Sequence, residues 1–70
     1  MKGIELFCYR LKELRKEKGL SARDLAEKLS VRDSTIIRWE SGKMMPTIDK
    51  LYALASFFGV TADFLLGLED

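Results

Sequence analysis

The feature that most constrains the fold is the stretch of residues 22–41, ARDLAEKLSVRDSTIIRWES, where two short helical patterns lie almost end to end. Apolar residues in the first pattern recur at i, i+3, i+4 and i+7, which places them on one helical face: Ala22, Leu25, Ala26 and Leu29. In the second pattern, Ile36 and Trp39 stand at i and i+3. Residues 30–32 (SVR) are too few for anything but a sharp corner, so the sequence predicts two helices joined by a tight turn.

This pattern is typical of a helix-turn-helix, whose second helix usually enters the major groove of DNA. Ala26 is a small residue on the inward face, where the second helix must cross close by. Val31 is a single apolar residue in the turn, and we expect it to plug into the core. Ser30 holds a corner that glycine would occupy more easily, and a left-handed backbone there would cost roughly 1 kcal/mol.

The flanking residues predict where the two helices begin and end. Ser21 is a good N-cap for the first helix, with Asp24 in the capping-box position three residues later. The second helix starts at Arg32 or Asp33, of which Asp33 is the better cap chemically. It should run to about Ser41, because a glycine follows directly.

Three further helices are expected around this motif, so the fold class is all-α with five helices. Residues 4–18 carry a broad apolar stripe, after which Gly19 can end the helix. That stripe is Ile4, Phe7, Cys8, Leu11 and Leu14. Residues 48–58 follow Thr47 as N-cap and end at Gly59. Their main stripe is Ile48, Leu51, Ala55 and Phe58, widened by Leu54 and Tyr52.

A short last helix is expected after Thr61, with Phe64 and Leu65 pointing inward. This arrangement leaves Leu66 and Leu68 without an obvious core position. Two apolar residues at a chain end are either a dimer surface or a loosely packed terminus, and the sequence leaves both interpretations open.

Length and composition limit the class of protein. Seventy residues predict one domain, residues 1–70, and 47% hydrophobic with 33% charged residues is a globular composition. No apolar run approaches the ~20 residues of a membrane helix, and the N-terminus does not resemble a signal peptide. The single cysteine, Cys8, excludes an intramolecular disulfide and fits a reducing, cytoplasmic compartment. We expect Cys8 to be structural.

Charge and residue content bear on function. The net charge is only +1, but residues 1–20 carry six basic and three acidic side chains, and residues 48–70 carry one basic and four acidic. A basic front and an acidic back can orient a domain on a polyanion. The chain has no histidine, no CxxC pair, no phosphate-binding glycine loop and no metal-ligand cluster. We therefore expect neither an enzyme nor a cofactor or metal site.

From Phe7 to Leu68 the sequence resembles the phage repressor/Cro type of helix-turn-helix, the xenobiotic response element family of bacterial DNA-binding transcriptional regulators. The resemblance implies a compact, five-helix, lambda-repressor-like domain with the motif at helices 2 and 3. It rests on residues 10–15, 18–21, 25–29, Val31, 34–36, 38–40, 42–43, Pro46 and 59–60.

The resemblance also implies roles for single positions. Those that commonly reach bases or flanking phosphates are Arg32, Asp33, Ser34 and Arg38. Ser41 and Lys43 match loop positions that grip the DNA backbone. Arg15 and Glu40 match a pair that often forms a partly buried salt bridge and sets the angle of the recognition helix. Ala22 stands where many of these domains carry a phosphate-binding glutamine, so that contact is missing.

The chemistry of the candidate residues agrees with DNA contact. Arg38 can donate two parallel hydrogen bonds to guanine O6 and N7, and Lys43 presents a point charge to phosphate. Ser34 and Thr35 can bond phosphate or base. Ile37 is an isoleucine on an outward stripe, so it is either partly buried at the helix edge or in contact with a thymine methyl group.

Asp33 and the loop methionines do not fit the expected pattern. Asp33 would repel phosphates unless it caps its own helix, pairs with Arg32, or accepts a hydrogen bond from cytosine N4; capping is the favoured interpretation. Met44 and Met45 replace basic or polar residues, which should lower nonspecific affinity and flatten its salt dependence.

Two functions follow. The first is a sequence-specific transcriptional regulator, a repressor that binds an inverted-repeat operator in double-stranded DNA as a homodimer, with Leu66 and Leu68 as the candidate contact. The alternative is a protein-interaction module or antitoxin-like partner-binding protein on the same fold, favoured by Ala22, Asp33 and the exposed apolar residues.

Overall fold

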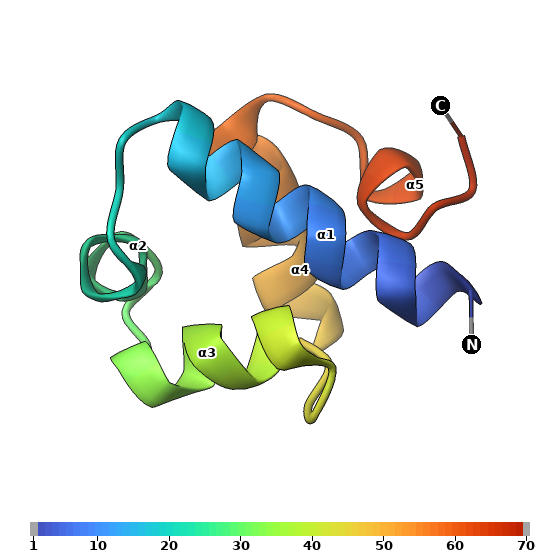
Figure 1. The fold of residues 1–70 in the computed structure, drawn as a ribbon. Helices are drawn as coiled ribbons and strands as arrows, with labels where there is room; N and C mark the ends of the chain where they lie inside the picture. Colours follow the sequence, from blue (N-terminus) through green and yellow to red (C-terminus); the bar gives the residue numbers. More distant parts are fainter. Residues whose placement is uncertain (1, 70) are drawn as a thin grey trace.

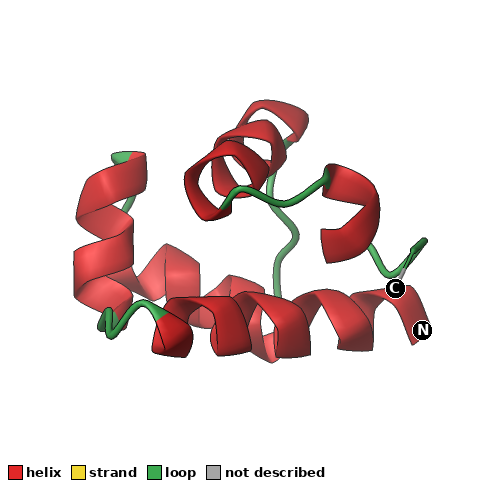
Figure 2. Cartoon of the chain, turned by 90° about the horizontal axis from the view of Figure 1, so that it is seen from above, coloured by secondary structure: helices red, strands yellow, loops and turns green. Residues whose placement is uncertain are grey.

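A computed structural model describes residues 2–69, which form five helices and no strand (Figures 1 and 2). The helices are α1 (Lys2–Glu17), α2 (Ala22–Leu29), α3 (Asp33–Ser41), α4 (Ile48–Phe58) and α5 (Ala62–Leu65). The all-α, five-helix prediction is therefore confirmed, and α2 and α3 are the two helices of the motif. Figure 1 shows α1 crossing the molecule, with α3 below it and α4 behind it.

The core receives side chains from all five helices. Its buried members are Phe7, Leu11, Leu25, Ala26, Leu29, Ile36, Trp39, Leu54, Ala55 and Leu65. α2 packs on α3, and α3 packs on α1, so the second helix of the motif lies between two others. Each fully buried leucine in such a core stabilises the fold by about 2–5 kcal/mol relative to alanine. The nine residues of α3 are held by this packing, because an isolated helix of that length is marginal in water.

The helix ends lie close to the predicted ones, but only some of the predicted caps form. Thr47 is the N-cap residue of α4, yet its side chain makes no capping bond. Ser21 and Asp24 form a complete capping box at the start of α2. Thr61 accepts a hydrogen bond from the N–H of Phe64, which caps α5. α3 begins after Arg32, the N-cap residue, whose side chain makes no capping bond. Asp33 is therefore the first residue of α3 rather than its N-cap.

The turn of the motif has the tight geometry expected from its length. Ser30 adopts a left-handed backbone, with φ 59° and ψ 42°. Val31 is half-buried against the core, and its N–H donates to the carbonyl oxygen of Ala26 at 3.0 Å. The left-handed Ser30 is thus the corner that lets α3 start directly after α2.

The predicted inward face of α4 is wrong in part. Ile48 is 86% exposed and Tyr52 is 73% exposed, whereas Leu54 and Ala55 are buried. α4 carries two apolar stripes that share Ala55, and only the one through Leu51 can face the core. The other, through Ile48 and Tyr52, borders an open groove of about 440 Å³.

The C-terminal segment, residues 66–69, packs on α1. The expectation that Leu66 has no position in the packed interior is therefore wrong. Leu66 is half-buried, and its carbonyl oxygen lies beside Gly3. Gly67 lies so close to Leu6 that a β-carbon would come within 2.8 Å of its side chain. Leu68 is 73% exposed, so only this member of the proposed pair is free to contact a partner.

Arg10 connects this segment to α1. Its guanidinium lies 4.1 Å from the ring centroid of Phe64 and donates to the Phe64 carbonyl oxygen. It also donates to the carbonyl oxygen of Glu69 at 2.7 Å. No local pattern in the sequence marks these contacts, because the partners of Arg10 lie more than 50 residues away.

We predict that Ser30→Gly stabilises the protein by roughly 0.5–1 kcal/mol. Glycine relieves the strain of the left-handed backbone, and this gain exceeds the extra conformational entropy that glycine loses on folding. Ser56→Gly, the same change inside α4, should destabilise it by about 0.5 kcal/mol. Urea unfolding followed by the fluorescence of Trp39 measures both. A Ser30→Gly variant less stable than the natural chain would contradict the strain argument.

Candidate nucleic-acid interface

One side of α3 packs into the molecule and the opposite side faces outward. Ile36 and Trp39 are buried on the inner side. Six of the candidate DNA-contacting residues are exposed: Arg32, Asp33, Ile37, Arg38, Ser41 and Lys43. The other two, Ser34 and Thr35, are half-buried. The structure thus brings all eight candidates onto α3 and its two ends.

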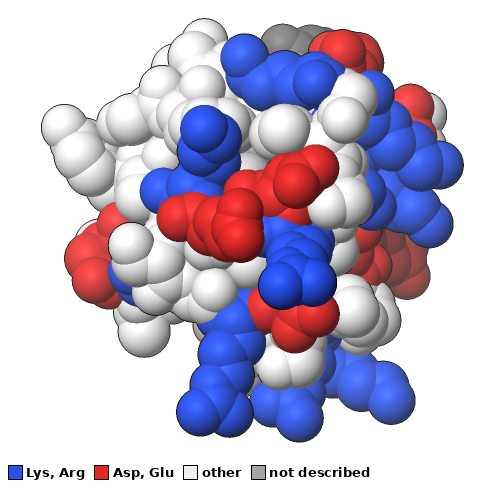
Figure 3. All heavy atoms as spheres, turned by 90° about the vertical axis from the view of Figure 1, so that its left-hand side faces the viewer, with Lys and Arg blue, Asp and Glu red and all other residues white. Residues whose placement is uncertain are grey.

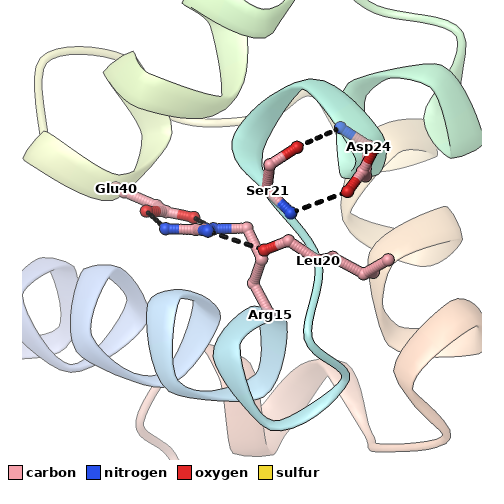
Figure 4. Close-up of polar contacts among 5 residues, drawn as sticks. All are labelled: Arg15, Leu20, Ser21, Asp24 and Glu40. Atoms are coloured by element: carbon pink, nitrogen blue, oxygen red, sulfur yellow. Dashed lines mark hydrogen bonds and ion pairs between the residues drawn. The ribbon is translucent and has the colours of Figure 1, made fainter.

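The ion pair implied for Arg15 and Glu40 is present and is bidentate (Figure 4). Nε of Arg15 donates to Oε2 of Glu40 at 2.6 Å, and Nη2 donates to Oε1 at 3.0 Å. The two side chains are only 14% and 10% exposed. The hydrogen bond to Glu40 raises the pKa of Arg15, so the guanidinium stays charged. This pair fixes α3 to α1.

The same guanidinium also reaches the chain that leads into α2. Nη1 of Arg15 donates to the carbonyl oxygen of Leu20 at 2.8 Å. Directly after Leu20, the N–H of Ser21 donates to Asp24, and the N–H of Asp24 donates to Ser21, both at 3.0 Å (Figure 4). The bond from the Ser21 N–H lowers the pKa of Asp24. One side chain of α1 therefore orients both helices of the motif.

Two further contacts brace the motif from behind, and sequence reasoning missed both. Nζ of Lys50 on α4 donates to the carbonyl oxygen of Leu29 at 3.1 Å, at the end of α2. Sγ of Cys8 donates to the carbonyl oxygen of Trp39 at 3.3 Å, near the end of α3. Burial raises the pKa of the Cys8 thiol, which fits a structural role. No local pattern marks such contacts, because the partners lie far apart in the sequence.

The start of α3 carries a carboxylate on its exposed side. Oδ1 of Asp33 accepts a hydrogen bond from the N–H of Ser34 at 2.8 Å. Asp33 forms no ion pair with any residue that the structure describes, so the proposed pair with Arg32 is not formed. Asp33 thus binds the N–H of the next residue in its own helix from the first helical position, and it is not the N-cap that the capping interpretation expected.

At the other end of α3, backbone groups organise the loop. Oγ of Ser41 donates to the carbonyl oxygen of Arg38 at 3.2 Å, and the N–H of Lys43 donates to the same oxygen at 3.0 Å. The Arg38 and Lys43 side chains remain exposed. Ile37 is 57% exposed, which favours contact over partial burial. Met44 and Met45 are each 37% exposed.

Basic side chains gather at the edge of the molecule to which α3 belongs. In Figure 3 the lower edge, where α3 lies in Figure 1, is mainly blue. The middle of that view mixes red and blue, and its left part is mostly uncharged. Blue also gathers along the upper right edge of that view, so positive charge is present at the candidate interface but is not confined to it.

Residues 2–69 contain neither a metal-ligand cluster nor a membrane-spanning helix. Nowhere in that range do three or more metal-binding side chains of His, Cys, Asp or Glu come together. None of the helices in that range is both long enough and apolar enough to cross a membrane.

Comparison with known proteins places residues 11–65 in a helix-turn-helix family model. The chain is 38% identical over 65 residues to an uncharacterized HTH-type transcriptional regulator, YobD of Bacillus subtilis, covering 93% of this chain and 58% of the relative. It is 42% identical over 64 residues to the HTH-type transcriptional activator BcrR of Enterococcus faecalis, covering 91% and 31%. A 26 kDa repressor protein of Escherichia phage HK022 is 43% identical over 47 residues, covering 67% and 20%.

A solved structure supports the same relationship. The crystal structure of a transcriptional regulator from Listeria innocua superposes with a TM-score of 0.84 at 38% identity, covering 91% of this chain and 60% of that one. The chain therefore spans less than two thirds of the length of these proteins.

We predict that breaking the Arg15–Glu40 pair from either side destabilises the fold by about 2–4 kcal/mol, because the remaining charge stays partly buried without a partner. Arg15→Met and Glu40→Leu each test this by urea unfolding. The double variant should be more stable than either single variant, since it strands no charge. Lys12→Met, on the exposed side of α1, is the control. Strictly additive losses in the double variant would show that the two residues are not coupled.

Proposed function

We propose, from the premise that this chain belongs to the helix-turn-helix family of DNA-binding transcriptional regulators, that it represses transcription by binding an inverted-repeat operator. The family is not enzymatic. In this proposal residues 1–70 act as one DNA-binding domain in the cytoplasm, the compartment of bacterial DNA. α3 enters the major groove, and two copies of the chain read the two half-sites.

The observation that supports this proposal is the outward side of α3. Arg38 is exposed on it, and its planar guanidinium suits the O6 and N7 acceptors of guanine. Arg32 and Lys43 lie exposed at the two ends of α3, where they suit phosphates on either side of the groove. The rigid anchoring of α3 by Glu40 favours recognition of a fixed sequence, because a preorganised helix loses little freedom on binding.

Repression is the finer part of the proposal, because the relatives include both an activator and a phage repressor by name. A protein that occupies promoter DNA blocks transcription without further contacts, whereas activation needs a surface that contacts the transcription machinery. The exposed residues of α3 suit binding to promoter DNA, and repression by occupancy needs nothing more.

Exposed apolar residues favour the alternative, a protein-interaction module. Ile37, Met44 and Met45 lie on or next to α3, and Ile48 and Tyr52 border the α4 groove. A protein partner that covers these residues would not require Arg38 or Lys43, which makes the two functions separable.

We predict that Arg38→Ala weakens binding to the best operator about 10-fold or more and relaxes the preference at one base pair. Lys43→Ala should weaken binding to all sequences alike. It should also lower the slope of log binding constant against log salt concentration by about 1 in magnitude. Binding is measured by fluorescence anisotropy across a salt series, on duplexes selected from a random pool. Lys12→Ala is the control. Unchanged DNA binding in both variants would contradict the proposal and favour a protein partner.

We predict that the chain dimerises on an operator whose half-site centres lie about 34 Å apart. Leu68→Ser should weaken this dimer, because Leu68 is the exposed member of the proposed contact. Ile48→Ser is the matched control on the α4 groove. Sedimentation velocity with and without the operator gives the stoichiometry. One chain per operator at saturation would contradict the dimer, and a loss caused only by Ile48→Ser would move the contact to α4.

A further inference from the structure

We propose that Asp33 selects cytosine, by accepting a hydrogen bond from the N4 amino group in the major groove. This inference rests on the proposed function, since it requires α3 to lie in that groove. It goes beyond that function because it assigns a base to one residue of the recognition surface.

The position of Asp33 is suited to base contact. Asp33 is the first residue of α3 and is exposed. In helix-turn-helix proteins the N-terminal residues of the second helix contact base edges. The aspartate side chain is short and has few rotatable bonds. The backbone at the start of α3 therefore largely determines which way its carboxylate points.

The carboxylate is already oriented. Oδ1 accepts from the N–H of Ser34 at 2.8 Å, and no hydrogen bond to Oδ2 is formed by the residues that the structure describes. Asp33 also has no ion pair within that part of the chain. One oxygen therefore holds the side chain against the helix, and the other keeps its capacity to accept.

A carboxylate discriminates sharply among the bases. Guanine presents two acceptors in the major groove, thymine an acceptor and a methyl group, and adenine an acceptor beside its amino donor. Cytosine alone presents a donor without an acceptor on the same base. An ionised Asp33 is repelled by the first two and partly by adenine, so it selects cytosine largely by excluding the others.

The neighbours of Asp33 on the helix fit a mixed half-site. Ile37 follows four residues later, which places it on the same side of α3, and it is 57% exposed. Arg38 is the next residue and is also exposed. Together with Asp33 they present an acceptor, an apolar group and a double donor, which match cytosine, the thymine methyl group and guanine.

The test is selection from a random DNA pool with the natural chain and with Asp33→Asn. Asparagine retains the oxygen that binds the Ser34 N–H, so the atom that it presents to the groove becomes an amino donor, which suits the acceptors N7 and O6 of guanine. We expect guanine to replace one enriched cytosine and the preference for cytosine to fall roughly 10-fold. Asp63→Asn, which removes one exposed negative charge at the start of α5, is the matched control and should leave the selected sequence unchanged.

A second variant, Asp33→Ser, keeps a helix-capping oxygen without the charge. It should lose the preference at the same position without gaining guanine, and thermal melting shows whether both variants fold. If the natural chain enriches no sequence, the proposed function fails together with this inference. If it enriches an operator that changes with Arg38→Ala but not with either Asp33 variant, the function stands and the assignment of Asp33 is wrong.

Discussion

The arrangement of the helix-turn-helix depends on one guanidinium group. Arg15 donates to both carboxylate oxygens of Glu40 and to the carbonyl oxygen of Leu20, so α1, α3 and the entry to α2 meet at one side chain. Because the pair is largely shielded from water, small displacements of either helix would leave a charge unsatisfied. The contact therefore favours a single angle between the two helices of the motif. Apolar packing alone would tolerate more variation, since it has no direction.

Because of this anchoring, the residues that hold α3 in the fold and the residues that α3 exposes lie on different sides of a very short helix. Ile36, Trp39 and Glu40 hold α3 from the inside, while Asp33, Ile37 and Arg38 take no part in the core. Substitutions on the outer side can therefore change the exposed surface of α3 without changing the fold. The left-handed Ser30 and the contact of Lys50 with Leu29 serve the same end, because they fix where α3 begins and where α2 ends.

The sequence predicted what depends on local signals and missed what depends on distant partners. The bounds of α2, α3 and α4 were predicted from the capping box of α2 and from the glycines or tight turns that end each helix, and the structure has them as expected. The inward side of α4 was misjudged because two apolar stripes compete, and only the neighbouring helices decide between them. Arg10 and Lys50 could not be assigned, since their partners are backbone oxygens far away in the sequence. The Arg15–Glu40 pair was reached only through the family resemblance.

The charges of the candidate interface indicate how such a protein would divide affinity from specificity. Ala22 cannot bind phosphate, Met44 and Met45 are uncharged, and Asp33 is an exposed acidic residue at the start of α3. Affinity for arbitrary DNA grows with the number of phosphates neutralised, so this surface should bind the wrong sequences weakly. Base contacts then have to supply a larger share of the binding free energy. A regulator built in this way loses little of its population to nonspecific sites, and discrimination rests on the few outward side chains that α3 holds rigidly in place.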